Sequence, residues 1–392
     1  MLLRAGAAAV AATVLAPAGR AAAAPAADAP APAGTRDGLR DELRGALEDL
    51  RAMGVTGAQG QISIGRRDVV ARAGVADLGT RAPMPAAGRF RIGSNTKTFV
   101  SVVVLQLAGE GRLSLDDTVE RWLPGVVAGN GNDGARITVR QLLQHTSGLY
   151  NYVDDLAAIG SAEQYVRHRY DHYDPADLVA MAMRHAPNFA PGEHWDYSNT
   201  NYVLAGMIVR RVTGRSWAEQ VRDRITRPLG LRDTYFPYDH PSLPASSARA
   251  YQQFAPGGPL VDVTEFNLTA ADAAGGLVST TDDLARFWRA LQRGELLRPA
   301  QAAELHRTVL AETFQEIRAG MRYGLGIFWV PTRRGGFWAH PGGVPGTSTF
   351  NGVSDSGDRA VVVYRTTGLA DPAAGGALDA RALALVEHVM SG

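Results

Sequence analysis

Strand-forming patterns stand at the two ends of this chain, and helical patterns fill the region between them. Two apolar runs, Gln61–Ile64 and Val69–Ala71, flank a short polar turn and predict a hairpin. From Arg322 onward the pattern predicts successive antiparallel strands at 323–330, 336–340, 347–353 and 359–366. Strands at both ends with a helical middle predict one antiparallel sheet built from both termini.

Helical periodicity places the other expected elements. Apolar residues recur at helical spacing over 37–53, 98–108, 139–144, 177–185, 202–212 and 377–390. A further helix begins near residue 281, capped by Thr280 or Thr281. We expect a mixed α/β (α+β) fold in which helices flank the sheet, with an α/β part at 37–93 and 311–392. A mainly helical subdomain at 94–310 is inserted, and a cleft between two such parts is a usual place for a site.

The first residues have the pattern of a targeting segment. Met1–Arg4 is a short positive start, residues 5–18 are apolar and rich in alanine, and small residues follow at 21–24. The apolar stretch is shorter than the roughly 20 residues that a membrane span needs. We therefore expect a signal peptide within 1–28, a single catalytic domain over 29–392, and a secreted protein without a stable membrane span after processing.

The composition and charge of the chain limit the classes of partner that the sequence predicts. The formal net charge is +1 and the arginines are scattered, so the sequence predicts neither nucleic acid nor an anionic membrane as a partner. Cysteine is absent, which excludes disulfides and thiol chemistry. The sequence leaves the oligomeric state open.

Lys97 is the only lysine, in a chain whose other basic residues are all arginine. A buried lysine can be pushed toward neutrality and act as a base, whereas arginine cannot. Ser94 precedes Lys97 by three residues, so the two share a helix face, and Ser94 lies at the helix N-terminus, where the dipole favours a developing alkoxide. This spacing predicts a serine nucleophile activated by a lysine.

Two further motifs follow in order. Tyr197-Ser198-Asn199 comes after a Pro-Gly turn, and His340-Pro341-Gly342 lies on an expected edge strand. An ammonium nearby can lower the pKa of a tyrosine, so Tyr197 is expected to relay protons together with Lys97. Taken singly, Ser94 could equally be a helix cap, Tyr197 a core residue and His340 a surface residue; the three motifs together favour catalysis.

These motifs resemble those of the serine β-lactamase/penicillin-binding-protein superfamily, on its class C side. The chain is most similar to the secreted actinomycete D-alanyl-D-alanine carboxypeptidases/transpeptidases, from about residue 55 to the end. Supporting strings include Ile92–Lys97, Ile137–Gln141, His145–Tyr150, Tyr197–Asn201, Ala274–Thr280 and Tyr323–Gly326. The resemblance implies a β-lactamase/DD-peptidase-like fold and an acyl-enzyme at Ser94.

The resemblance also implies roles for the remaining site residues. Asn199 would contact Lys97 and the substrate amide, and His340 would support the Tyr197 proton network. Backbone N–H groups of Ser94 and Gly343 would form the oxyanion hole. The glycines at 342 and 343 would let a substrate backbone approach the strand. Trp195, next to the second motif, either lines the cleft or packs in the core.

The sequence departs from these carboxypeptidases at the substrate-carboxylate anchor. Phe328 stands where the family has an arginine, and Gly343 stands where it has a threonine. Phenylalanine cannot make the bidentate pair that arginine makes with a carboxylate. Arg333 and Arg334, on the turn that follows, are the candidate replacements.

The leading prediction is a D-alanyl-D-alanine carboxypeptidase-like serine hydrolase that acts on D-amino-acid peptides. The alternatives are a β-lactamase, an esterase, a D-amino-acid peptidase or amidase, a peptide cyclase, or a non-turnover β-lactam receptor. Small molecules or peptides are the expected partners, and no metal or organic cofactor is predicted. The histidines at 168, 172, 185 and 194 lack the spacing of a fixed ligand motif.

Overall fold

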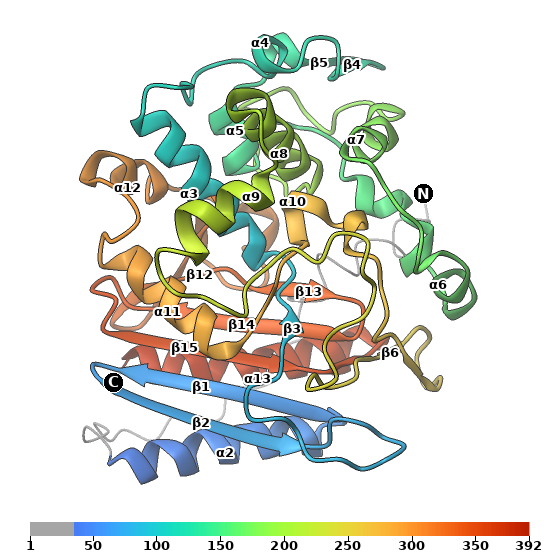
Figure 1. The fold of residues 1–392 in the computed structure, drawn as a ribbon, viewed down its shortest axis with the longest axis vertical. Coiled ribbons are helices and arrows are strands. Elements are labelled where there is room, and N and C mark those ends of the chain that lie inside the picture. Colours follow the sequence, from blue (N-terminus) through green and yellow to red (C-terminus); the bar gives the residue numbers. More distant parts are fainter. Residues whose placement is uncertain (1–34, 392) are drawn as a thin grey trace.

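The computed structural model describes residues 35–391, so the predicted signal peptide lies outside the described residues. A nine-stranded antiparallel sheet runs through it (Figure 1), in the order β2-β1-β15-β14-β12-β11-β10-β9, with β13 also paired to β14. The strands are β1 (Gly57–Ile64), β2 (Arg67–Gly74), β9 (Val309–Leu310), β10 (Arg322–Tyr323), β11 (Phe328–Thr332), β12 (Gly335–Ala339), β13 (Gly342–Val344), β14 (Thr347–Val353) and β15 (Arg359–Arg365).

The two ends of the chain meet at β1 and β15. Ile62 of β1 lies opposite Val361 of β15, and both side chains are fully buried. The hairpin of β1 and β2 thereby continues the sheet formed by the C-terminal strands. The prediction of one antiparallel sheet built from both termini is confirmed.

Helices cover both faces of this sheet. Helices α2 (Arg36–Ala52) and α13 (Pro372–Ser391) pack on one face, where Val361 and Val363 point. Helix α11 (Thr281–Gln292) packs on the other face, where Val362 and Tyr364 point. Burial on both faces explains why β15 is a continuous apolar run rather than an alternating one.

The helical part lies over the sheet, on the α11 side (Figure 1). Helix α3 is buried on nearly every side and is mostly apolar after its first turn, as expected of a central helix. The helices are α3 (Asn95–Gly109), α4 (Val119–Trp122), α5 (Val139–Gln144), α6 (Ala162–His168), α7 (Pro175–Met183), α8 (Thr200–Thr213), α9 (Trp217–Val221), α10 (Asp272–Gly275) and α12 (Pro299–Leu305).

Short strand pairs tie the two parts together. β3 (Phe90–Arg91), which leads into α3, pairs with β8 (Val278–Ser279). β16 (Thr367–Gly368), which follows β15, pairs with β6 (Tyr251–Gln253) and so reaches β7 (Leu260–Asp262). A further pair, β4 (Ala128–Gly129) and β5 (Asn132–Asp133), lies in the helical part.

One predicted strand is wrong in extent. The run 323–330 forms two strands, β10 and β11, because the chain turns at Gly324–Ile327 between them. Gly326 has a φ of +85°, and a Cβ there would lie 2.2 Å from Ser101 Oγ of α3. Only glycine allows this turn to pack against the central helix.

The helix cap at Thr280 is confirmed, since its hydroxyl accepts a hydrogen bond from the Asp283 N–H at 3.2 Å.

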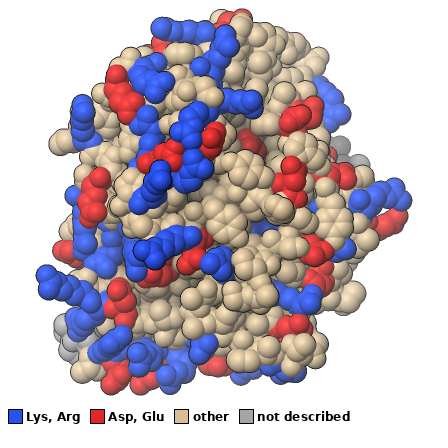
Figure 2. All heavy atoms as spheres, in the orientation of Figure 1, with Lys and Arg blue, Asp and Glu red and all other residues tan. Residues whose placement is uncertain are grey.

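Charges on the surface are mixed in sign. Basic and acidic side chains alternate over the face shown in Figure 2, without an extended region of one sign. Among residues 35–391, none of the helices combines the length and the hydropathy of a bilayer-crossing segment.

A buried ion pair joins the sheet to α13. Arg365 of β15 and Asp379 of α13 lie 2.6 Å apart, and their side chains are 3% and 2% exposed. The same helix also carries an exposed pair, in which Arg381 contacts Asp49 of α2 at 2.8 Å.

We expect Asp379→Ala to lower the free energy of unfolding by about 3–5 kcal/mol, because it leaves Arg365 as a buried, unpaired charge. The matched variant Asp49→Ala breaks the exposed pair and is expected to cost at most about 1 kcal/mol. Urea unfolding followed by circular dichroism measures both. Equal losses in the two variants would contradict the assignment of Arg365–Asp379 as a structural link.

Candidate active site

Ser94 is held in the turn that starts α3. It immediately precedes the helix, and its side chain makes no capping hydrogen bond. The preceding Gly93 has a φ of +52°, and a Cβ there would lie 2.5 Å from the Gly343 nitrogen of β13. The turn therefore lies directly against the β13 backbone, and the Ser94 hydroxyl is free for other partners.

The Lys97 amine is completely buried one helical turn from Ser94. Its Nζ lies 3.0 Å from Ser94 Oγ, 2.7 Å from Asn199 Oδ1 and 2.7 Å from the Ala274 carbonyl oxygen. Burial lowers the pKa of Lys97 well below its ordinary value of 10.5.

These contacts fix the direction of the hydrogen bonds. A neutral amine has two hydrogens, and the Asn199 Oδ1 and Ala274 oxygens can only accept. When Lys97 is neutral these two oxygens take both hydrogens, and the lone pair is left for Ser94 Oγ, 3.0 Å away. In this arrangement Lys97 can accept the proton of the serine hydroxyl.

Tyr197 also contacts the serine, but its pKa moves opposite to the sequence prediction. Burial raises the pKa of Tyr197 well above 10, and a hydrogen bond with the Ser94 side chain only partly offsets this. The prediction assumed an ammonium beside the phenol, whereas the buried Lys97 amine favours the neutral form. A neutral Tyr197 is a hydrogen-bond donor, and Lys97 Nζ lies 4.7 Å from the centre of its ring.

The Asn199 amide is oriented by a residue that the sequence interpretation missed. Asn151 Oδ1 accepts hydrogen bonds from the backbone N–H and from Nδ2 of Asn199, at 3.0 and 3.1 Å. This leaves Asn199 Oδ1 pointing at Lys97, so the expected contact between Asn199 and Lys97 is present. Asn151 belongs to no motif, and only the fold brings it to the site.

His340 lies elsewhere in the network than expected. Its Nε2 is 3.0 Å from the Tyr323 hydroxyl and its Nδ1 is 2.8 Å from the Pro341 carbonyl oxygen, so neither ring nitrogen bonds Tyr197. Because a carbonyl only accepts, Nδ1 carries the proton and Nε2 accepts from Tyr323. Burial lowers the pKa of His340 to about 3. His340 also follows the last residue of β12, Ala339, rather than lying on an edge strand.

His145 stands behind Tyr197 and was assigned no role from sequence. Its ring centre lies 4.2 Å from that of Tyr197, and its Nδ1 lies 3.3 Å from the Ser198 nitrogen and 3.0 Å from Asn201 Nδ2. Burial lowers the pKa of His145 well below 6.5. The neutral ring therefore supports the second motif from behind, and the string His145–Tyr150 was the available signal.

Phe328, at the expected carboxylate-anchor position, and Trp195, for which the sequence left packing open, both belong to the core. Trp195 and Phe328 are 2% and 1% exposed, and their ring centres lie 6.2 Å apart. Both pack around Tyr323, at 5.5 and 4.5 Å between ring centres. Phe328 is therefore a packing residue behind the site, and large aromatic neighbours decide this rather than its sequence position.

The third motif contacts the nucleophile turn through glycine. A Cβ on Gly342 would lie 1.9 Å from the Ile92 carbonyl oxygen, so this glycine admits the turn before Ser94 rather than a substrate backbone. Gly343 lines the cleft together with Ser94, as predicted. Arg333 and Arg334 lie on an exposed turn, where Arg334 reaches the Ser391 carbonyl of α13, and neither lines the cleft.

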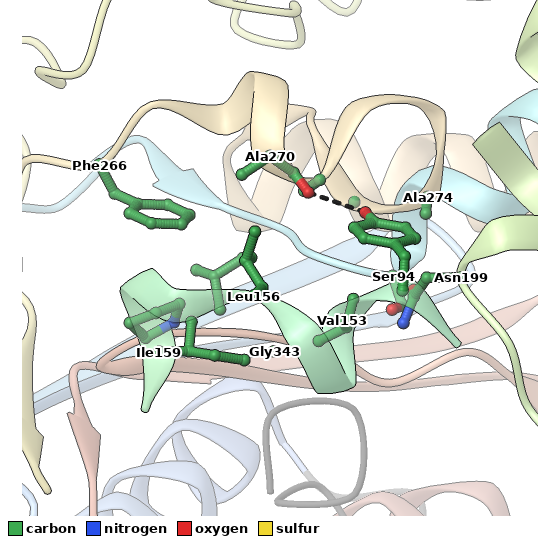
Figure 3. Close-up of a pocket in the computed structure, with 14 residues that line it drawn as sticks. Ser94, Val153, Leu156, Ile159, Asn199, Phe266, Ala270, Ala274 and Gly343 are labelled. Atoms are coloured by element: carbon green, nitrogen blue, oxygen red, sulfur yellow. Dashed lines mark hydrogen bonds between the residues drawn. The ribbon is translucent and has the colours of Figure 1, made fainter. Parts of the chain in front are cut away.

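An apolar cleft opens beside Ser94. In Figure 3, Ser94 and Asn199 stand at one end, and Leu156, Ile159 and Phe266 lie toward the other. The segments η2 (Tyr152–Asp155) and η3 (Ala157–Ile159) supply one wall. Among the described residues that line this cleft, none carries a charged side chain: Ser94, Tyr152, Val153, Leu156, Ile159, Asn199, Phe266, Ala270, Ala271, Ala274, Gly275, Gly343, Val344 and Pro345.

The four histidines considered for a metal each face a carboxylate. His168 lies beside Asp171, His172 beside Asp239, His185 beside Asp155 and His194 beside Glu312. Within 35–391, no group of three or more His, Asp or Glu side chains is arranged to hold a metal ion.

Comparison with known protein sequences identifies relatives of this chain. The family model described as Beta-lactamase matches residues 17–386. A penicillin-binding protein of Bacillus subtilis strain 168 is 28% identical over 292 residues, which are 71% of this chain and 60% of that protein. Protein flp of Staphylococcus aureus strain MW2 is 30% identical over 209 residues, which are 53% of this chain and 40% of that protein. The matched regions thus span about 40 to 60% of these relatives' lengths.

Solved structures match over nearly their whole length. A D-stereospecific amidohydrolase from Streptomyces sp. has a TM-score of 0.81 and 39% identity, covering 88% of this chain and 98% of that one. A D-amino acid amidase from Ochrobactrum anthropi SV3, complexed with D-phenylalanine, has a TM-score of 0.77 and 28% identity, covering 90% and 99%.

We expect the pH dependence of kcat/KM to report Lys97. Since its pKa is lowered well below 10.5, the rate should rise as the amine loses its proton and reach a plateau far below pH 10.5. Lys97→Arg keeps a long basic side chain that cannot lose its proton, so it removes the base and should lower kcat roughly 10²- to 10⁴-fold. Hydrolysis of a p-nitrophenyl ester measures both effects.

Tyr197→Phe is the control for this prediction. It removes the relay hydroxyl but leaves the amine, so the plateau should fall while the acidic limb stays at the same pH. A limb that moves in Tyr197→Phe, or that lies near pH 10, would show that Lys97 is not the base.

Proposed function

This chain belongs to the beta-lactamase family of serine hydrolases, and from that premise we propose that it is an amidohydrolase for D-amino-acid amides and short D-peptides. One observation carries the choice within the family: the cleft beside Ser94 is apolar and its described lining residues are uncharged. A substrate with a free terminal carboxylate would bury a charge there without a partner. The carboxamide of an amino-acid amide is uncharged and avoids this cost, and an apolar side chain suits the lining.

The likeness to solved structures supports the stereochemistry in this proposal. The D-stereospecific amidohydrolase is 39% identical and aligns over 98% of its length, and the D-amino acid amidase aligns over 99% of its length. The carboxypeptidase prediction keeps support from the Bacillus subtilis relative, of which this chain matches 60%. At the predicted carboxylate anchor, however, Phe328 is buried in the core.

In the proposed acylation step, Ser94 Oγ attacks the substrate carbonyl carbon while its proton passes to the Lys97 amine. Backbone N–H groups of Ser94 and Gly343 stabilise the oxyanion. As the carbon–nitrogen bond breaks, Tyr197 gives its proton to the leaving nitrogen and regains one from Lys97. Ammonia or an amine leaves, and the acyl group remains as an ester on Ser94.

Water completes the reaction in reverse order. A water molecule attacks the ester carbonyl carbon, its proton passes through Tyr197 and Lys97, and Ser94 leaves with a proton restored to its oxygen. Asn199 holds the amine through both steps, because its Oδ1 accepts one Lys97 hydrogen at 2.7 Å. The chain supplies every group that these proton transfers need.

A substrate panel tests this function. Wild type should release ammonia from D-phenylalanine amide at least about tenfold faster than it releases D-alanine from a diacyl-Lys-D-Ala-D-Ala peptide. It should discriminate against L-phenylalanine amide and should turn over nitrocefin slowly. Ser94→Ala should abolish each activity. Faster release of D-alanine than of ammonia would instead establish the carboxypeptidase.

We also propose that the chain is exported, from the positive start, the apolar run at 5–18 and the small residues at 21–24. Expression in a secreting actinomycete host should place the protein in the medium. N-terminal sequencing should find a new terminus within residues 22–29. Retention of Met1 on a cell-associated protein would contradict export.

A further inference from the structure

We propose that Asn95 and Asn351, here called the amide clamp, are positioning residues for the oxyanion hole. They hold the turn before Ser94 in register with β13, so that the N–H groups of Ser94 and Gly343 converge on one carbonyl oxygen. This inference rests on the proposed acyl-enzyme chemistry, and it assigns a role to two side chains that touch no substrate.

The clamp is a continuous chain of hydrogen bonds between the two segments. Asn95 Nδ2 donates to the Ile92 carbonyl at 3.1 Å, inside the nucleophile turn. Asn351 Nδ2, from β14, donates to Asn95 Oδ1. Asn351 Oδ1 in turn accepts from the His340 backbone N–H at 2.9 Å, where the chain enters β13. The start of α3 and the start of β13 are thereby joined through two side chains.

Both amides are buried, at 0% and 4% exposure, so these bonds do not compete with water. Each side chain acts as donor and acceptor at once, which neither a carboxylate nor an apolar side chain can do. The Trp288 indole N–H, 3.4 Å from Asn95 Oδ1, adds a second donor to the same oxygen. The clamp therefore requires amides at both positions.

The contact between the nucleophile turn and the β13 backbone does not by itself fix the register of the two segments. A Cβ on Gly342 would lie 1.9 Å from the Ile92 oxygen, and one on Gly93 would lie 2.5 Å from the Gly343 nitrogen. The two segments thus meet through glycine, without interlocking side chains. Directional hydrogen bonds from the clamp supply the missing constraint.

The Ser94 backbone N–H, which the clamp is proposed to position, has no other structural role. Among the hydrogen bonds between described residues, none uses the Ser94 N–H as donor. A backbone donor that serves no structural bond, in a residue that lines the cleft, is suited to an oxyanion. Since misplacement by about 1 Å can cost roughly 10²-fold in rate, a loosened clamp should reduce catalysis before it affects ground-state binding.

The test is a double-mutant cycle with Asn95→Ala, Asn351→Ala and the double variant. A fluorophosphonate titrates the active fraction, so that p-nitrophenyl ester hydrolysis is expressed per active site. We expect each single variant to lose roughly 10- to 100-fold in kcat with KM nearly unchanged. The double variant should be no worse than either single one, because both break the same connection.

A boronic acid supplies the second readout. Its tetrahedral adduct with Ser94 places an oxygen where the oxyanion forms, so its Ki should rise in proportion to the loss in kcat. Should the alanine variants fail to fold, Asn351→Asp keeps the volume and the acceptor for His340 N–H but loses the donor to Asn95. It should show the same loss.

Thr98→Val is the matched control. Thr98 is buried on the same helix, and its hydroxyl donates to the Gly326 carbonyl at 2.7 Å, away from β13. This variant should lower thermal stability but leave per-site kcat and the boronate Ki unchanged. Unchanged per-site values in the clamp variants, or an equal loss in Thr98→Val, would overturn the inference. Wild type that resists the fluorophosphonate would instead refute the proposed function.

Discussion

The site depends on one constraint, an amine buried without a counterion. Lys97 is completely buried, and its hydrogen-bond partners are oxygen atoms of Ser94, Asn199 and Ala274. Removing a lysine from water favours its neutral form, and a neutral amine beside a hydroxyl is a base rather than a charge. The apolar surroundings of α3 are therefore part of the chemistry, since they exclude the water that would keep Lys97 protonated.

The architecture serves this constraint by bringing three distant segments together. The nucleophile turn begins α3, the Tyr197–Asn199 turn begins α8, and β13 belongs to the C-terminal strands. The hairpin of β1 and β2 completes the sheet from the other end, and helices cover both faces. The sheet lies on one side of the turn before Ser94 and the buried helix α3 on the other, and the amide clamp joins the turn to the sheet.

Prediction from the sequence succeeded where the chemistry depends on the spacing of residues along one helix. Ser94 and Lys97 lie one helical turn apart, and local sequence sets that geometry. It did not place the partners of His340, which bonds Tyr323 and Pro341 rather than Tyr197, or the packing of Phe328 in the core. Burial and side-chain partners come from neighbours far along the chain. The pKa of Tyr197 was misjudged for the same reason, because burial outweighed any effect of Lys97.

The sequence by itself determined the sheet from both termini, the family resemblance and the pairing of Ser94 with Lys97. These follow from hydrophobic period and motif spacing, which are local properties. Only the tertiary structure decided that Lys97 is dehydrated, that Asn151 orients Asn199 and that the cleft has no charged wall. The physical reason is that desolvation and hydrogen-bond direction depend on which distant atoms surround a group, and no short stretch of sequence contains them.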